Sequence, residues 1–84
     1  MLFRSFNRIQ IEGEIKRGIL LRPKYFEIIV YFTPVKKTIF DIYTRSVDIN
    51  DKRLKLDFKI GDNISKAKDW VTKNGHEITF EKNK

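Results

Sequence analysis

The sequence predicts an α+β fold, in which an antiparallel β-meander of order β-β-β-β-α-β carries one helix packed on one face. Three observations predict it: strand-like patterns in several segments, one later segment with apolar residues at helical spacing, and short connections between them. We expect a single small domain over residues 1–84, with residues 82–84 frayed, because half of an 84-residue chain would lack a sufficient core. A strongly twisted form of this sheet would be partly barrel-like.

The first two strands are expected over residues 8–16 and 25–32. In the first, apolar residues alternate with polar ones, and Gly13 inside the run indicates a bulge or a bend. Pro23 cannot donate a hydrogen bond to a neighbouring strand, so it marks the connection. The second segment is almost continuously apolar, which is typical of a central strand, and its even positions are expected to face the core.

Two further strands are expected over residues 38–47 and 53–60, because turn-forming residues precede each of them. The second has the most regular alternation in the chain. Its four apolar positions are expected to face the core: Leu54, Leu56, Phe58 and Ile60. Its three basic residues would then lie on the opposite face, beside the tyrosines of the neighbouring strands: Arg53, Lys55 and Lys59.

A helix is expected over residues 64–73, followed by a last strand over residues 76–82. Asp62 or Asn63 is a suitable N-cap, and Asn74–Gly75 ends the helix because glycine readily adopts left-handed backbone angles.

Trp70 is expected to fill the space between helix and sheet. In the last strand, Ile78 and Phe80 are expected to point inward. The residues expected beneath the helix are Phe26, Ile28, Val30, Phe40, Ile42, Leu54, Leu56 and Phe58.

The side chains that catalysis or metal binding needs are scarce. The chain has no cysteine, which excludes disulfides, thiolate metal sites and cysteine nucleophiles. His76 is the single histidine, so one chain cannot form a histidine cluster, and a solvated or capping role is expected for it. No glycine-rich phosphate loop is present. We therefore expect no enzymatic activity, no catalytic residue, no metal site and no cofactor.

The sequence shows no targeting or membrane-crossing pattern. Its longest purely apolar run, residues 28–32, is far shorter than the about 20 residues needed to cross a bilayer. We expect a cytoplasmic protein without a membrane partner, and a membrane-surface role is a minor alternative. The many lysines and isoleucines beside a single alanine indicate a low-GC genome, as in many phages and other mobile elements.

The basic composition favours a nucleic-acid partner. Eighteen Lys+Arg against eleven Asp+Glu give a net charge of +7, although a low-GC composition also enriches lysine. Bases can stack on tyrosines while cations contact phosphates. The expected binding residues are Tyr25, Tyr31 and Tyr43 for stacking, with Arg17, Arg22, Lys24, Arg45, Lys52, Arg53 and Lys55 as the cations around them. The sequence thus predicts a small nucleic-acid-binding accessory module, for single strands or duplex.

The same residues also fit a protein-interaction module, either an inhibitor or an adaptor. The tyrosine face would then be an apolar hot spot rimmed by charge, and its partner would be another protein or a second copy of the chain in a homodimer. Alternatively, Leu2, Phe3 and Phe6 cover this face as a second small core. Both binding hypotheses require the tyrosines to lie on the side of the sheet away from Trp70.

Overall fold

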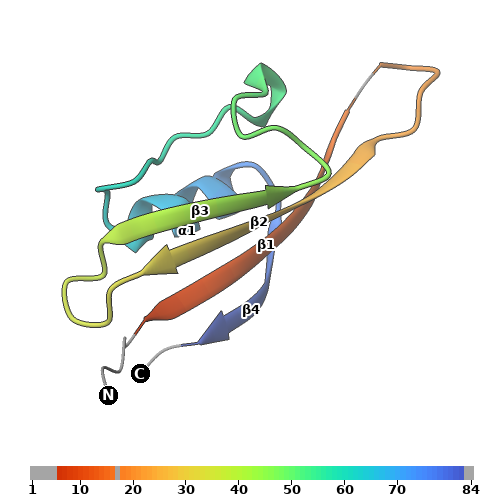
Figure 1. Cartoon of the computed structure of the whole chain (residues 1–84). Helices are drawn as coiled ribbons and strands as arrows, with labels where there is room; N and C mark the ends of the chain where they lie inside the picture. The colour runs from red at the N-terminus through yellow and green to blue at the C-terminus, as the bar shows by residue number, and fades with distance from the viewer. Residues whose placement is uncertain (1–5, 17, 83–84) are drawn as a thin grey trace.

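The computed structural model describes residues 6–16 and 18–82, which form one open antiparallel sheet with a helix against one face (Figure 1). The elements are β1 (Asn7–Ile15), β2 (Lys24–Phe32), β3 (Ile39–Arg45), the 3-10 turn η1 (Lys52–Leu54), α1 (Ile64–Lys73) and β4 (Glu77–Lys82). The strand order is β3-β2-β1-β4, so β1 to β3 form a meander and β4 returns beside β1. The predicted α+β meander is confirmed, and its sheet is open.

The hydrophobic core lies between the sheet and α1. The apolar even positions of β2 are buried, as their pattern predicts, together with the odd positions Ile9, Ile11 and Ile15 of β1. The helix contributes its apolar stripe of Ile64, Ala67, Trp70 and Val71. These residues form one cluster, so the strands, with a period of two residues, and the helix, with a period of about 3.6, share a single core.

The strand predicted over residues 53–60 is wrong. The chain forms η1 there, and Lys55 then adopts left-handed backbone angles, with φ at 51°, which a regular strand does not allow. Leu54 and Phe58 are buried, whereas Ile60 is 59% exposed. We call residues 53–60 the crossing segment. Its apolar residues alternate with polar ones because they contact the core, although its backbone forms no ladder of strand hydrogen bonds.

Trp70 fastens this crossing segment to the helix. Its indole Nε1–H donates a hydrogen bond to the carbonyl oxygen of Lys55 at 2.8 Å, and its ring contacts Phe58 edge-on at 5.5 Å. The segment ends beside β3, where the backbone N–H of Gly61 donates to the carbonyl oxygen of Ile39 at 2.9 Å. Trp70 thus fills the space between helix and sheet, as predicted.

A bulge in β3 reverses the predicted orientation of Phe40. Tyr31 pairs with Asp41, but Phe32 pairs with Ile39, so Phe40 is the extra residue between them. Ile39 is therefore buried, and Phe40 is 45% exposed on the side of the sheet away from α1.

A second irregularity has the same effect in β4. Gln10 pairs with Phe80 and Ile11 with Ile78, so the register shifts between the two pairs. Ile78 packs against the core as predicted, whereas Phe80 lies on the opposite face. An alternation carried across a bulge assigns the wrong face to the residues beyond it.

The predicted ends of α1 are confirmed. The side chain of Asn63 accepts a hydrogen bond from the backbone N–H of Ser65 at 2.9 Å, which makes it the N-cap. Asp62 instead accepts from the backbone N–H of Lys59. After the helix, Gly75 takes a φ of 71°, the left-handed conformation for which glycine is suited.

The molecule is elongated, with a longest dimension of 53 Å. Figure 1 shows that the β1–β2 hairpin projects beyond the other elements at one end, while the β2–β3 turn lies at the opposite end. Among the described residues, α1 is too short and too polar to span a bilayer.

Candidate functional site

Six aromatic residues lie on the face of the sheet that points away from α1. The strand register and the two bulges bring them together with charged residues of all four strands. We call this surface the open face, and its residues are Phe6, Arg8, Gln10, Glu12, Glu14, Tyr25, Glu27, Ile29, Tyr31, Phe40, Asp41, Tyr43, Arg45, Glu77, Phe80 and Lys82.

Tyr31 is the centre of an aromatic cluster on the open face. The rings of Phe6, Tyr43 and Phe40 surround it, with centroids 5.4, 5.7 and 6.1 Å away. Phe6 and Tyr43 meet it edge-on, an arrangement that aromatic pairs prefer. The three outer rings are 42% to 55% exposed, so much of the cluster faces solvent.

The tyrosines of the open face have carboxylates as neighbours. Partial desolvation and hydrogen bonding to Glu12 raise the pKa of Tyr25 to about 12, with a further contribution from Glu27. A hydrogen bond to Asp41 and the negative charge of its carboxylate raise the pKa of Tyr43. Both phenols are therefore neutral at physiological pH and have carboxylates beside them.

A polar network crosses the centre of the open face. Gln10 on β1 donates its amide N–H to Glu27 on β2 at 2.8 Å, and the guanidinium of Arg45 on β3 lies 3.5 Å from the same carboxylate. Glu27 is only 9% exposed, and burying an ionised carboxylate is costly unless such partners are present. A hollow of about 310 Å³ lies beside the network and is lined by Glu27, Ile29, Tyr31, Tyr43, Thr44 and Arg45.

Three carboxylates stand in a row across the same face. Glu12 on β1 is directly opposite Glu77 on β4 and Glu27 on β2. Like charges placed opposite each other on neighbouring strands destabilise a sheet. The row is therefore a feature that a cationic group from outside would stabilise. Among the residues that the structure describes, no cluster of carboxylates and histidine has the arrangement needed to hold a metal ion.

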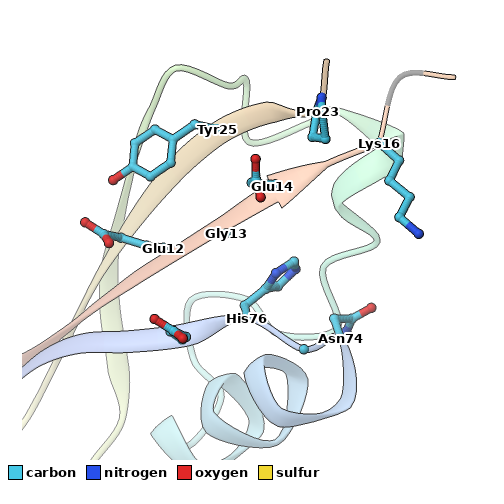
Figure 2. Close-up of a pocket in the computed structure, with 10 residues that line it drawn as sticks. Glu12, Gly13, Glu14, Lys16, Pro23, Tyr25, Asn74 and His76 are labelled. Carbon is cyan, nitrogen blue, oxygen red and sulfur yellow. The ribbon is translucent and has the colours of Figure 1, made fainter. Parts of the chain in front are cut away.

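A cleft of about 500 Å³ continues from the open face around β1, where β4 begins (Figure 2). Figure 2 shows Tyr25 and Glu12 on one side of β1, while His76 lies on the side of α1. The His76 ring is half-buried rather than solvated, because it packs against Phe26 and Trp70 with centroids 5.0 and 4.9 Å away. Its backbone N–H donates to the carbonyl oxygen of Val71 at the end of α1, which agrees with the capping role that was the predicted alternative.

Four of the ten predicted binding residues lie on the open face: Tyr25, Tyr31, Tyr43 and Arg45. The other predicted cations that the structure describes lie at the end of the molecule that carries the β1–β2 hairpin. Arg22 and Lys24 belong to that hairpin, whereas Lys52, Arg53 and Lys55 belong to η1 and the residue after it. Arg17 lies outside the described residues.

The prediction that Arg53, Lys55 and Lys59 lie among the tyrosines is wrong, because residues 53–60 are not part of the sheet. Arg53 is also engaged within the chain. Its Nε and Nη2 donate to the two carboxylate oxygens of Asp51 at 3.0 and 2.7 Å. Hydrogen bonds from Arg53 hold the pKa of Asp51 at about 2.

Several cations of the hairpin end are nevertheless close together. The charge of Lys24 contributes to the low pKa of Asp51, so β2 begins near η1. Lys16, Arg53 and Lys55 line one cleft of about 410 Å³. We call this region, with Arg22, Lys24 and Lys52, the basic end.

Sequence reasoning missed the acidic side chains that surround the tyrosines. Glu12 and Glu14 are on the polar side of an alternating strand, and following that alternation onto the tyrosine face would have identified them. Asp41 follows in the same way from Tyr43, two residues further along β3, whereas the exposed rings of Phe40 and Phe80 could not be placed because a bulge displaces each of them.

A comparison of the chain with protein-family models, with curated proteins and with solved structures finds no match in any of the three.

Proposed function

We propose that this protein is a cytoplasmic protein-interaction module that binds a cationic segment of a partner protein on its open face. The aromatic cluster carries the proposal. Four contacting rings, three of them 42% to 55% exposed, form an apolar patch of the kind that marks protein interfaces. The partner's apolar side chains would pack on these rings.

The charge of the open face supports a cationic partner. Five carboxylates (Glu12, Glu14, Glu27, Asp41 and Glu77) stand against three cations (Arg8, Arg45 and Lys82), although the whole chain has a net charge of +7. Such a face repels phosphate groups and attracts lysine or arginine, because complementary potentials across an interface favour association.

Each of the two most exposed tyrosines illustrates the same preference. A nucleic-acid base stacked on Tyr25 or Tyr43 would bring its phosphate close to Glu12 or Asp41. An arginine from a partner protein could instead stack on the ring and donate hydrogen bonds to the carboxylate. The tyrosines are thus better placed for a basic peptide than for a phosphate backbone.

The basic end supports a second candidate function, the binding of nucleic acid away from the tyrosines. Lys16, Arg53 and Lys55 line one cleft, and Lys24 lies near it. If about five phosphates were contacted there, log K would fall with log[salt] with a slope of about −4 to −5. This candidate requires oligonucleotide binding that is measurable by fluorescence anisotropy at about 50 mM salt.

Affinity capture from a lysate, with and without nuclease treatment, separates the two candidates. We expect a captured protein that survives nuclease and moderate salt. Tyr43→Ala should remove most of the capture, because it deletes an exposed ring of the aromatic cluster. Lys55→Ala should leave it unchanged, because Lys55 lies off the open face.

The opposite pattern would contradict the proposal. Capture that is lost after nuclease treatment, and that depends on Lys55 rather than Tyr43, would assign the function to nucleic acid at the basic end. Both variants change side chains with substantial exposure, so circular dichroism should show unchanged folding in each.

A further inference from the structure

Three consecutive aliphatic residues stand in solvent at the tip of the β1–β2 hairpin. Ile19 and Leu20 are 102% and 97% exposed, and Leu21 is 58% exposed. A single exposed aliphatic side chain is ordinary, but three adjacent ones at a projecting tip are not needed to fold the chain. Their exposure indicates that the tip contacts something outside the molecule.

Cations flank the aliphatic tip. Lys16 precedes it along the chain, and Arg22 and Lys24 follow it. Behind the tip, Arg53 and Lys55 share a cleft with Lys16. The hairpin end of the molecule therefore has aliphatic side chains at its tip and cationic side chains behind them.

We propose that the hairpin tip inserts into the surface of an anionic lipid bilayer. Ile19, Leu20 and Leu21 would enter the boundary between headgroups and acyl chains, while Lys16, Arg22 and Lys24 contact lipid phosphates. The proposal concerns a different surface from the open face, so the two can succeed or fail separately.

The shape of the tip favours a bilayer over a macromolecular partner. The hairpin projects from the long molecule as a narrow convex point (Figure 1). A flat surface can surround such a tip only if the surface deforms, as lipid headgroups do. Nucleic acid would use the cations but would leave the aliphatic residues in water, because phosphates and sugars offer them no apolar site.

The sequence predicts no membrane partner because its longest apolar run is too short to cross a bilayer, but shallow insertion does not require such a run. Crossing needs about 20 apolar residues in a helix, whereas a tip with a few aliphatic side chains and neighbouring cations needs only to reach the acyl boundary. Binding of this kind is reversible, because both the apolar contact and the charge attraction are modest. It would hold the module on a membrane surface while leaving the open face accessible.

Sedimentation with lipid vesicles tests the proposal. At about 0.1 M salt, the full chain should bind vesicles of phosphatidylcholine that contain about 30% phosphatidylserine. It should bind vesicles of pure phosphatidylcholine much more weakly. The double variant Ile19→Ser, Leu20→Ser should lower the partition coefficient at least about tenfold, because it removes most of the inserted apolar surface. Lys24→Gln should lower it about fivefold.

Matched controls lie at the opposite end of the sheet. Val35 is 90% exposed in the β2–β3 turn, and Lys36 lies beside it. Val35→Ser and Lys36→Gln change the same kinds of side chain and should leave vesicle binding unchanged. Equal losses in tip and control variants would overturn the proposal, as would the absence of any vesicle binding.

The lack of cysteine allows a second, direct readout. An environment-sensitive dye on Leu20→Cys should shift its emission to the blue when anionic vesicles are added, whereas the same dye on Val35→Cys should not. If an oligonucleotide is bound and vesicles cause no shift at position 20, the hairpin end is a nucleic-acid site and the bilayer proposal is wrong.

Discussion

An imidazole ring stands directly over the backbone of β1 at Gly13. A Cβ atom built at this position would lie 2.4 Å from Nδ1 of His76 and 2.8 Å from Cζ of Phe26. Both distances are too short for real atoms. The bulge predicted at Gly13 is absent from the pairing of β1 with β2, which continues through this residue without a register shift. The glycine is needed instead for close packing of His76 against the sheet.

Gly13→Ala should lower the free energy of unfolding by about 1–3 kcal/mol, because two packed rings must move to admit the methyl group. Urea denaturation measures the change. His76→Ala provides the control background, since the added methyl group should cost at least about 1 kcal/mol less when the imidazole is absent. An equal cost in both backgrounds would show that the two residues do not compete for space.

His76 also predicts a pH dependence of stability. Burial lowers its pKa in the folded state below the ordinary value of 6.5, because a protonated imidazole is poorly solvated between aromatic rings. The unfolded chain then binds a proton at higher pH than the folded chain does. The stabilisation is fully present above about pH 6.5 and decreases as the pH falls below it.

Urea denaturation at about pH 7.5 and 5.5 checks this prediction. The parent chain should lose more stability between the two values than His76→Gln, which has no titrating group at this position. Asp51 does not contribute in this range, because its pKa of about 2 is far lower. Equal losses in both chains would contradict the assignment.

Among the elements, the crossing segment shows how a strand pattern arises without a strand. Its apolar residues contact the core, but η1 and the left-handed Lys55 prevent a regular ladder. A true strand would bury Leu54 and Ile60 alike, whereas the structure buries Leu54 and leaves Ile60 59% exposed.

Alanine substitutions distinguish these arrangements. Leu54→Ala should lower the free energy of unfolding by about 2–5 kcal/mol, because it leaves a cavity beneath the segment. Ile60→Ala should change it by less than about 0.5 kcal/mol. Thermal denaturation of the two variants is sufficient, and comparable losses would restore the strand interpretation.

Local signals made the helix predictable and the strands less so. The ends of α1 depend on the Asn63 cap and on Gly75, which act within a few residues of the helix. The faces of β3 and β4 depend on bulges at Phe40 and before Phe80. A bulge is set by pairing with another strand, so the alternation within one segment does not show it.

Across the whole molecule, charge is divided between two surfaces. The open face holds five carboxylates around its aromatic residues, while the basic end gathers cations from the β1–β2 hairpin and η1. The sequence predicted which tyrosines share a face, because period-two alternation in β2 is regular. The sequence also predicts cations among these tyrosines, because the pattern of residues 53–60 resembles that of a strand in the sheet. The net charge of the chain contains no information about where on the surface the charges lie.

The row of Glu77, Glu12 and Glu27 predicts opposite effects on stability and on binding. Glu12→Gln should raise the free energy of unfolding by about 0.2–1 kcal/mol, because it removes like charges opposite each other. The same change should weaken binding of a cationic partner. Asp57→Asn is the matched control, since Asp57 is exposed in the crossing segment. If Glu12→Gln raised the free energy of unfolding and also strengthened binding of the cationic partner, the row would not belong to the binding surface.

Fluorine NMR of the bound and free protein tests the proposed docking surface most directly. All three tyrosines of the chain lie on the open face, and the single tryptophan lies in the core on the other side. When a lysine- and arginine-rich peptide selected for binding is added to fluorotyrosine-labelled protein, the resonances of Tyr31 and Tyr43 should shift, while that of fluorotryptophan at Trp70 should not. Bound peptide that leaves all three tyrosine resonances in place would show that partners dock elsewhere.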